Sequence, residues 1–306
     1  MDKVSIIIPT YKRTNELKRA IDSAIKQTYK NIEIIVIDDN AKNIEIRKQV
    51  EEIMKNYPTV KYIQNKENLG GALTRNVGIQ TATGKFVSFL DDDDEFYEEK
   101  VEKQVNLYKK LDNKNCCMIY CYANRITSNK KIVGIEHKDF EGKQLYNHMM
   151  GGIAVTSSWL CPKDKLLEVG GFDDVPCQQE GTLLLKLLAK NYEVYRVPEV
   201  LFLFYVHNKL DGSGITNINE KYINGKLNYI EKCRKNYDKL NQRQRINVEY
   251  HFSVELFNLY CYTKDRKNML IYLKKQLKQK PINKETIKSI IKFIFLKSYI
   301  KRSVNK

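Results

Sequence analysis

Four consecutive aspartates, Asp91 to Asp94, are the residues whose type and spacing most directly suggest chemistry. They follow an apolar stretch, residues 85–90, that has the composition of a buried β-strand. Adjacent carboxylates repel one another, and a divalent cation, which prefers oxygen ligands, is a reason for a fold to hold them together. The end of a strand is also where open α/β sheets bind ligands. A solvated acidic loop that leads into a helix is the alternative.

The elements that must position this run alternate along the first half of the chain. Continuous Val/Ile-rich segments at 4–8, 33–37, 60–63 and 85–90 predict strands covered on both faces, the first of them ended by Pro9. Helical patterns lie between and after them, over roughly 17–25, 43–56, 70–80 and 98–111. This order predicts an α/β fold with a mostly parallel sheet and right-handed crossovers.

The second half is less regular. Residues 117–135 suggest two strands, 154–161 one more, and 193–206 one or two, while Leu183 to Leu188 reads as a buried helix. From about residue 219 onward the chain reads as entirely helical.

Charge divides the chain in two. Residues 209–306 contain 23 of the 53 Lys and Arg but 8 of the 37 Asp and Glu, so they carry +15 of the formal net charge of +16. We therefore predict a near-neutral α/β domain over 1–212 and a basic helical region over 213–306 that faces an anionic partner.

The cysteines and the apolar segments bear on the compartment. The seven cysteines are scattered without the paired spacing of a zinc site, and Cys116, Cys117 and Cys121 fall in a core-like strand. No secretory signal opens the sequence, and no apolar run reaches the roughly 18–20 residues that span a bilayer. We expect reduced thiols and a cytoplasmic protein.

Several motifs in a fixed order together resemble glycosyltransferase family 2, the inverting, nucleotide-sugar-dependent enzymes with the GT-A fold. The resemblance covers about residues 3–208. It rests on these segments: Val4 to Arg13, Ile37 to Asn40, Asn68 to Asn76, Phe89 to Asp94, Gly170 to Asp173, Gln179-Glu180, and Tyr205 to His207. It implies a GT-A (Rossmann-like) mixed, mostly parallel sheet flanked by helices, with an all-helical basic C-terminal extension.

The resemblance also implies how the donor is bound. Residues expected to contact the nucleotide sugar are Pro9, Thr10, Tyr11, Arg13, Asp39, Arg75, Asp91 and Asp92. Asp39 would accept a hydrogen bond from the base, expected to be uracil, because a carboxylate can take the ring N–H. Arg75 would supply a cation near the diphosphate. An Asx turn is the alternative role for Asp39, and a surface ion pair is the alternative for Arg75.

A divalent metal ion is also expected in the site. Asp91-x-Asp93 resembles the family's Asp-x-Asp element, so Asp93, with His207 as a later ligand, is expected to hold Mn²⁺ or Mg²⁺. Such an ion stabilises negative charge on a departing nucleoside diphosphate. A structural histidine is the alternative role for His207.

Inversion in one displacement requires a general base on the acceptor hydroxyl. The resemblance assigns this base to Glu180, in Gln179-Glu180-Gly181-Thr182-Leu183. The family more often has Glu-Asp, and in a shifted alignment Gly181 takes the aspartate's place and the chain lacks a base. Trp159 and the hydroxyls at 156–158 either line the acceptor site or, for Trp159, belong to the core.

The basic region ends in a segment with apolar residues Ile287, Ile290, Ile291 and Ile294 on one side of a helical wheel. Together with nearby lysines, this predicts a helix that lies on an anionic membrane surface rather than spanning it. A helical cap with a solvated basic face is the alternative. Membrane docking would suit a lipid-linked acceptor and a protein peripheral on the inner face of the plasma membrane.

We therefore expect a metal-dependent glycosyltransferase that moves a sugar from a UDP-sugar to a glycan or lipid-linked acceptor of a surface polysaccharide. A nicotinamide dehydrogenase is disfavoured because Pro-Thr-Tyr-Lys-Arg stands where a glycine-rich loop would follow the first strand. A nucleotide-binding pseudoenzyme and a basic nucleic-acid-binding protein remain the alternatives. We expect no nucleic-acid partner, because the basic excess lies on helices rather than on an aromatic-bearing sheet.

Overall fold

The computed structural model describes residues 1–206 and 218–295 and resolves into two compact units. The described residues of the first unit are 1–148, 152–175 and 179–206. Those of the second unit are 149–151, 176–178 and 218–295.

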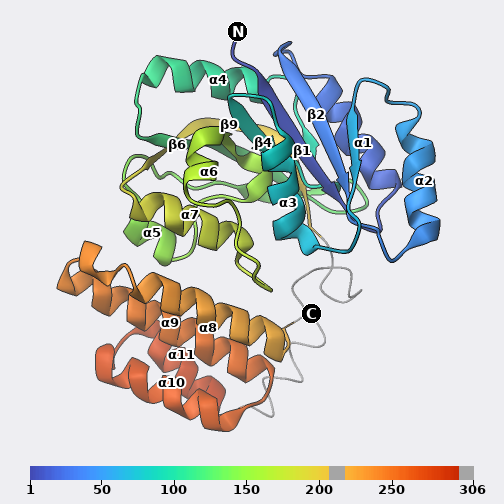
Figure 1. The fold of residues 1–306 in the computed structure, drawn as a ribbon. Coiled ribbons are helices and arrows are strands. Elements are labelled where there is room, and N and C mark those ends of the chain that lie inside the picture. The colour runs from blue at the N-terminus through green and yellow to red at the C-terminus, as the bar shows by residue number, and fades with distance from the viewer. Residues whose placement is uncertain (207–217, 296–306) are drawn as a thin grey trace. The chain divides into compact units, whose positions relative to one another are not determined.

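Within the described residues, the first unit contains a nine-stranded sheet (Figure 1). Its strands are β1 (Val4–Thr10), β2 (Ile32–Asp38), β3 (Lys61–Gln64), β4 (Phe86–Phe89), β5 (Glu95–Phe96), β6 (Cys116–Ile126), β7 (Ile132–Glu136), β8 (Leu160–Pro162) and β9 (Glu193–Tyr205). Their order is β3-β2-β1-β4-β8-β6-β9-β5, and β7 pairs with β6. The strands β1 to β4 pair in parallel with one another, and β6 pairs in parallel with β9. The strands β5, β7 and β8 are antiparallel to the strands that they pair with.

Helices cover both faces of this sheet (Figure 1). They are α1 (Asn15–Ile25), α2 (Ile44–Met54), α3 (Gly70–Thr81), α4 (Lys100–Leu111), α5 (Leu145–Met149), α6 (Lys163–Glu168) and α7 (Gln179–Ala189), with a 3₁₀ turn, η1, at Thr156–Ser158. One core cluster packs Val4, Ile6 and Ile8 of β1 against α1, α2 and α4. The other packs Ile7, on the opposite face of β1, against α3, α6 and α7. Successive strand residues face opposite sides, so a run such as Ile6-Ile7-Ile8 is buried throughout.

This mixed sheet between two helical layers confirms the predicted fold class. The first strand is longer than predicted, because it continues through Pro9 to Thr10. Pro9 is tolerated since β4 stops pairing with β1 at Ile7, so no β4 ladder hydrogen bond is lost to the missing N–H. The predicted strand over 154–161 is instead the turn η1 followed by the short β8.

The second unit is helical in the residues that the structure describes. It contains α8 (Glu220–Arg234), the 3₁₀ turn η2 (Tyr237–Lys239), α9 (Gln242–Tyr262), α10 (Arg266–Gln279) and α11 (Lys284–Ile294). Each α-helix begins at an Asn or Asp whose side chain accepts a hydrogen bond from the first turn: Asn219, Asn241, Asp265 and Asn283.

Packing within this unit is partly polar. Arg234 on α8 forms two hydrogen bonds with Glu249 on α9, at 2.6 and 2.8 Å, and Lys226 pairs with Glu255 at 3.0 Å. Phe257, Met269 and neighbouring apolar residues form its small apolar core. Across 1–206 and 218–295, no helix has the length and hydropathy needed to cross a membrane.

Candidate functional site

The four aspartates lie where the sequence places them, directly after β4. The chain leaves the sheet at Leu90, whose N–H donates to the carbonyl of Ile7 at 3.0 Å. It then turns at once, since the N–H of Asp94 donates to the carbonyl of Asp91 at 3.0 Å. Each of the four carboxylates has a protein partner, and Asp92 and Asp93 share one, Arg13.

Arg13, from the segment between β1 and α1, neutralises the middle of the run. Its guanidinium lies 2.7 Å from Asp92 and 3.0 Å from Asp93. The N–H of Tyr11 also donates to Asp92, at 3.2 Å. Burial nevertheless raises the pKa of Asp92 to about 6, with Arg13 opposing the rise and the neighbouring Asp93 adding to it.

Asp94 is almost fully buried and is held by two donors. The Ser157 hydroxyl donates to it at 2.6 Å, and the N–H of Tyr205, at the end of β9, donates to it at 3.0 Å. Burial raises the pKa of Asp94 well above its ordinary value, and the charges of Asp93 and Asp91 raise it further. Ser157 also accepts a hydrogen bond from the N–H of Asp91 at 3.1 Å, so η1 holds the acidic turn at both of its ends.

Arg75 connects the acidic turn to a second element. It lies on α3, and its guanidinium pairs with Asp91 and donates to the side-chain oxygen of Gln179 at 3.2 Å. The same guanidinium is 5.7 Å from the ring of Phe172. Burial alone would lower its pKa, but the carboxylates of Asp91, Glu180 and Asp92 together outweigh burial and raise the pKa, so Arg75 stays charged. One cation therefore lies between the end of β4 and the start of α7.

Asp39 accepts four hydrogen bonds from the protein. The side chains of Asn65 and Asn68 donate to it at 2.8 and 3.0 Å, and the N–H groups of Leu69 and Gly70 each donate at 2.8 Å. The two N–H groups belong to the start of α3, so the buried carboxylate caps that helix. Contact with a nucleobase requires one of these donors to leave, and that role stays a prediction.

Glu180 stands in the first turn of α7. Gln178, the residue before α7, has φ of +59°, which turns the chain sharply into the helix. Gln179 is held by Arg75, and the carbonyl of Gly181 accepts a hydrogen bond from Nε2 of His148 at 2.8 Å. Glu180 itself is half-buried and close enough to Arg75 for its charge to act on it.

The turn at Gly171 is clamped by Asn76 of α3. The Asn76 amide donates to the carbonyl of Phe172 and accepts from its N–H, both at 2.8 Å. Gly171 has φ of +67°, and a Cβ there would lie 2.3 Å from the Asn76 side-chain oxygen. Glycine is therefore required at Gly171 both by the backbone angle and by the clamp.

The other predicted residues fall into three groups. Pro9, Thr10 and Tyr11 end β1 beside the acidic turn, and Tyr11 is exposed. Trp159 is fully buried among core residues, which favours its structural role. His207 lies outside the described residues. Ser157 was expected among the hydroxyls that line the acceptor site, whereas its side chain bonds to Asp94. Sequence reasoning missed His148, which carries no spacing signal that would have marked it.

The donor set suits a divalent cation in its chemistry. Asp91 and Asp93 offer oxygen ligands, and the four carboxylates of the turn face two arginines, which leaves an excess of negative charge. Burial is the main cause of the raised pKa of Asp94, and the charges of Asp93 and Asp91 add to it. In the part of the chain that the structure describes, no three His, Cys, Asp or Glu side chains converge into a ready-made metal site.

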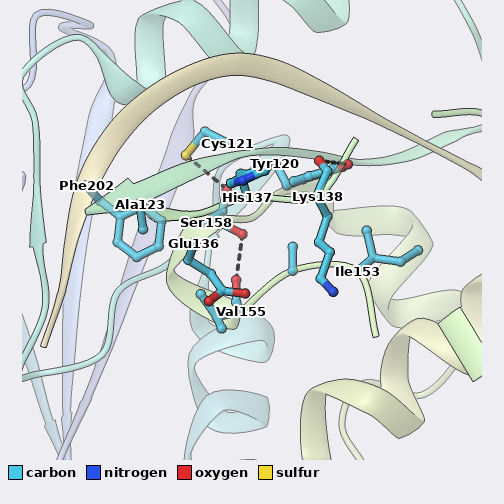
Figure 2. A pocket seen from close by; sticks show the side chains of 11 residues that line it. Tyr120, Cys121, Ala123, Glu136, His137, Lys138, Ile153, Val155, Ser158 and Phe202 are labelled. Atoms are coloured by element: carbon cyan, nitrogen blue, oxygen red, sulfur yellow. Dashed lines mark hydrogen bonds between the residues drawn. The ribbon is translucent and has the colours of Figure 1, made fainter. Parts of the chain in front are cut away.

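A small pocket lies between β6, β7 and the segment that leads into η1 (Figure 2). Glu136, His137 and Lys138 line it together with apolar residues such as Ile153 and Phe202. Its free volume of about 10 Å³ is that of about one water molecule, so it does not hold a sugar.

Comparison with known proteins identifies relatives of the chain. The family model described as "Glycosyl transferase family 2" matches residues 5–160. A glycosyltransferase of Haemophilus influenzae is 30% identical over 257 residues, which is 81% of this chain and 82% of that protein. One from Rickettsia prowazekii is 45% identical over 118 residues, 39% of this chain and 35% of its own length. The chain thus spans about a third of the length of the Rickettsia relatives that it matches.

Two solved structures share the fold. Staphylococcus aureus TarS in complex with UDP-GlcNAc superimposes with a TM-score of 0.58 at 15% identity, over 91% of this chain and 92% of that one. A mannosyltransferase from Pyrobaculum calidifontis in complex with GDP-Man and Mn²⁺ gives 0.59 at 15% identity, over 95% and 87%.

Proposed function

This chain belongs to glycosyltransferase family 2, and we propose that it moves a sugar from a UDP-sugar to a glycan or lipid-linked acceptor in surface polysaccharide synthesis, with inversion. The observation that carries the proposal is the position of Arg75. It contacts Asp91, at the end of β4, and Gln179, next to Glu180 at the start of α7. One residue thus joins the expected donor-binding turn to the expected acceptor-activating helix.

The donor would lie over the carboxyl ends of β1 and β4. In this proposal Pro9, Thr10, Tyr11 and Asp39 border the nucleoside. Arg13 and Arg75 supply positive charge beside the diphosphate, where bidentate guanidinium contacts are strong. The ends of parallel strands are the general location of ligand sites in such sheets.

Mn²⁺ or Mg²⁺ would be held by Asp93, with Asp91 close by and His207 as a further ligand. When bound, the ion stabilises the charge that develops on the leaving diphosphate. Asp92 would also contact the nucleotide sugar, and Asp92 and Asp94 both have a structural role in this proposal. Through Arg13, Ser157 and the backbone, they hold the turn so that the other two carboxylates keep their positions.

Glu180 would act as the general base. As the acceptor oxygen forms its bond to the anomeric carbon, the hydroxyl proton passes to the Glu180 carboxylate. The bond between the anomeric carbon and the diphosphate oxygen breaks at the same time, and the nucleoside diphosphate leaves with the electron pair. Attack from the face opposite the leaving group inverts the anomeric centre.

We also propose that residues 1–212 form the catalytic domain and that 213–306 dock on an anionic membrane surface, on the cytoplasmic side. The orientation of α11 supports docking, because Thr286 and Ser289 are its buried residues. Ile287, Ile291 and Ile294, which share one face, are 46%, 52% and 61% exposed. Ile290, which was predicted on the same face, packs instead against the apolar core of the second unit. Apolar residues turned outward beside lysines are typical of interfacial helices.

The donor can be identified without the acceptor by slow hydrolysis of nucleotide sugars. UDP-GlcNAc, UDP-glucose, UDP-galactose and GDP-mannose would each be incubated with the protein and Mn²⁺, with and without EDTA. We expect hydrolysis of one UDP-sugar that EDTA abolishes. Binding of UDP without hydrolysis of any sugar would favour the pseudoenzyme, and absence of UDP binding would contradict the proposed function.

Replacement Glu180→Gln tests the base. The amide cannot accept the proton but occupies the same space, so we expect kcat to fall by about 10²–10⁴-fold with UDP affinity almost unchanged. Hydrolysis rates and calorimetric titration with UDP give the two quantities. Turnover close to that of the unaltered chain would show that the base lies elsewhere.

A further inference from the structure

Both chain neighbours of Glu180 are held by side chains from other helices. Gln179 accepts from Arg75 of α3 at 3.2 Å, and the carbonyl of Gly181 accepts from His148 of α5 at 2.8 Å. A carbonyl only accepts, so Nε2 of His148 carries the proton in this contact. His148 is 3% exposed, so water does not compete for the bond.

The start of α7 needs such support. First-turn N–H groups of a helix have no intrahelical partner, so its position depends on other contacts. Gly181 adds backbone freedom, and it has no side chain with which to pack. Thr182 braces the turn only locally, through a hydrogen bond from its hydroxyl to the carbonyl of Gln179 at 3.0 Å. Among the hydrogen bonds described here, those from Arg75 and His148 tie the first turn to the rest of the first unit.

We propose that His148 is a positioning residue, which holds the first turn of α7 so that the Glu180 carboxylate meets the acceptor hydroxyl. The proposal rests on the proposed role of Glu180 as base. A displacement of about 1 Å at a reacting group can cost on the order of 100-fold in rate. Loss of the His148 contact therefore affects turnover rather than donor binding.

Two variants separate the hydrogen bond from the volume of the ring. His148→Gln keeps an N–H at a similar reach, and His148→Leu fills similar space without a donor. For hydrolysis of the UDP-sugar found with the panel above, we expect His148→Leu to lower kcat by about 10- to 100-fold with KM within twofold. His148→Gln should recover most of that loss. Asn147→Ala is the matched control, since Asn147 on α5 bonds only to Gln144 in the contacts described, at 2.6 Å.

A double variant tells whether His148 acts through Glu180. If it does, His148→Leu added to Glu180→Gln causes almost no further loss, because the group that it positions no longer takes a proton. Independent, multiplicative losses would overturn the inference. Full activity of the Glu180→Gln variant would instead refute the role of Glu180 as base. Failure of the positioning role of His148 can therefore be distinguished from failure of the proposed base.

Hydrogen exchange gives a readout that needs no turnover. Amides of α7, residues 179–189, should exchange about tenfold faster in His148→Leu than in the unaltered chain, and at the normal rate in Asn147→Ala. Faster exchange confined to α7 supports the positioning role. Unchanged exchange there, or equally faster exchange throughout the first unit, would contradict it.

Discussion

Two arginines determine how four adjacent carboxylates coexist at the end of β4. Arg13 binds the middle pair, and Arg75 binds Asp91. Arg75 differs from a surface ion pair because its side chain is only 12% exposed and it has further partners in Gln179 and Phe172. We expect a residue in this position to contribute to stability, because its loss leaves a carboxylate beside other carboxylates without its cation.

Replacement of Arg75 by Met tests the contribution of this arginine to stability. We expect the free energy of unfolding to fall by about 1.5–3 kcal/mol, the usual contribution of a hydrogen bond to a charged group. Urea unfolding measures the change. Lys55→Met is the matched control, since its pair with Glu52 is 69% exposed on both sides and should contribute less than about 0.5 kcal/mol. Equal effects of the two replacements would contradict the structural role of Arg75.

At the scale of elements, α4 contains a buried cation that no proposed catalytic role uses. Lys100 is completely buried, donates to Gln104 at 2.9 Å and to Ser88 at 3.2 Å, and lies 4.0 Å from the ring of Phe96. Burial lowers its pKa to about 8. Because Ser88 is in β4, Lys100 links α4 to the strand that precedes the acidic turn, and it makes that link sensitive to pH.

The sign of the pH effect follows from proton binding. Between about pH 8 and 10.5 the unfolded chain keeps the Lys100 proton and the folded chain loses it, so this residue makes stability rise with pH. The free energy of unfolding of the unaltered chain minus that of Lys100→Met should therefore increase from pH 8 to pH 10. Buried thiols act in the opposite direction, but they are present in both proteins and cancel. A difference that stays flat or falls over this range would refute the assignment.

At the scale of the whole molecule, charge and apolar exposure are distributed unequally along the chain. Residues 209–306 carry +15 of the net +16. In the second unit, α10 also exposes Leu270, Ile271 and Leu277. Each basic residue near an anionic bilayer contributes about 1 kcal/mol, so the basic excess can provide attraction while the exposed isoleucines of α11 insert.

The membrane proposal can be tested with vesicles that contain phosphatidylserine. Replacing Ile287 and Ile291 together by Gln should weaken binding by about 3 kcal/mol, roughly 100-fold, from the loss of apolar burial. Co-sedimentation measures it, and high salt should weaken binding of the unaltered chain as well. Ile132 and Ile135 of β7, 55% and 54% exposed, replaced by Gln provide the control. Binding that is insensitive to the α11 change would contradict the insertion of α11.

The amino-acid sequence by itself determined the local elements and the end of the strand at which the acidic run stands. Hydrophobic periodicity and the position of Asp91 to Asp94 after an apolar run are local properties, so they can be read without the fold. The order and types of the motifs also indicated the family correctly. The prediction that Pro9 ends the first strand was wrong. Whether a strand tolerates proline depends on where the neighbouring strand stops pairing with it, which the sequence of one strand does not show.

Only the tertiary structure decided which side chains meet. Ser157 reaches Asp94 across 63 residues, Asn68 reaches Asp39 across 29, and His148 reaches Gly181 across 33. Ser157 and Asn68 stand in segments that the sequence singled out, but their positions do not show which carboxylates they contact, and His148 has no spacing that distinguishes it. Their partners are set by how η1, α3, α5 and α7 pack against the sheet, because long-range contacts follow from the burial of whole faces rather than from neighbouring residues.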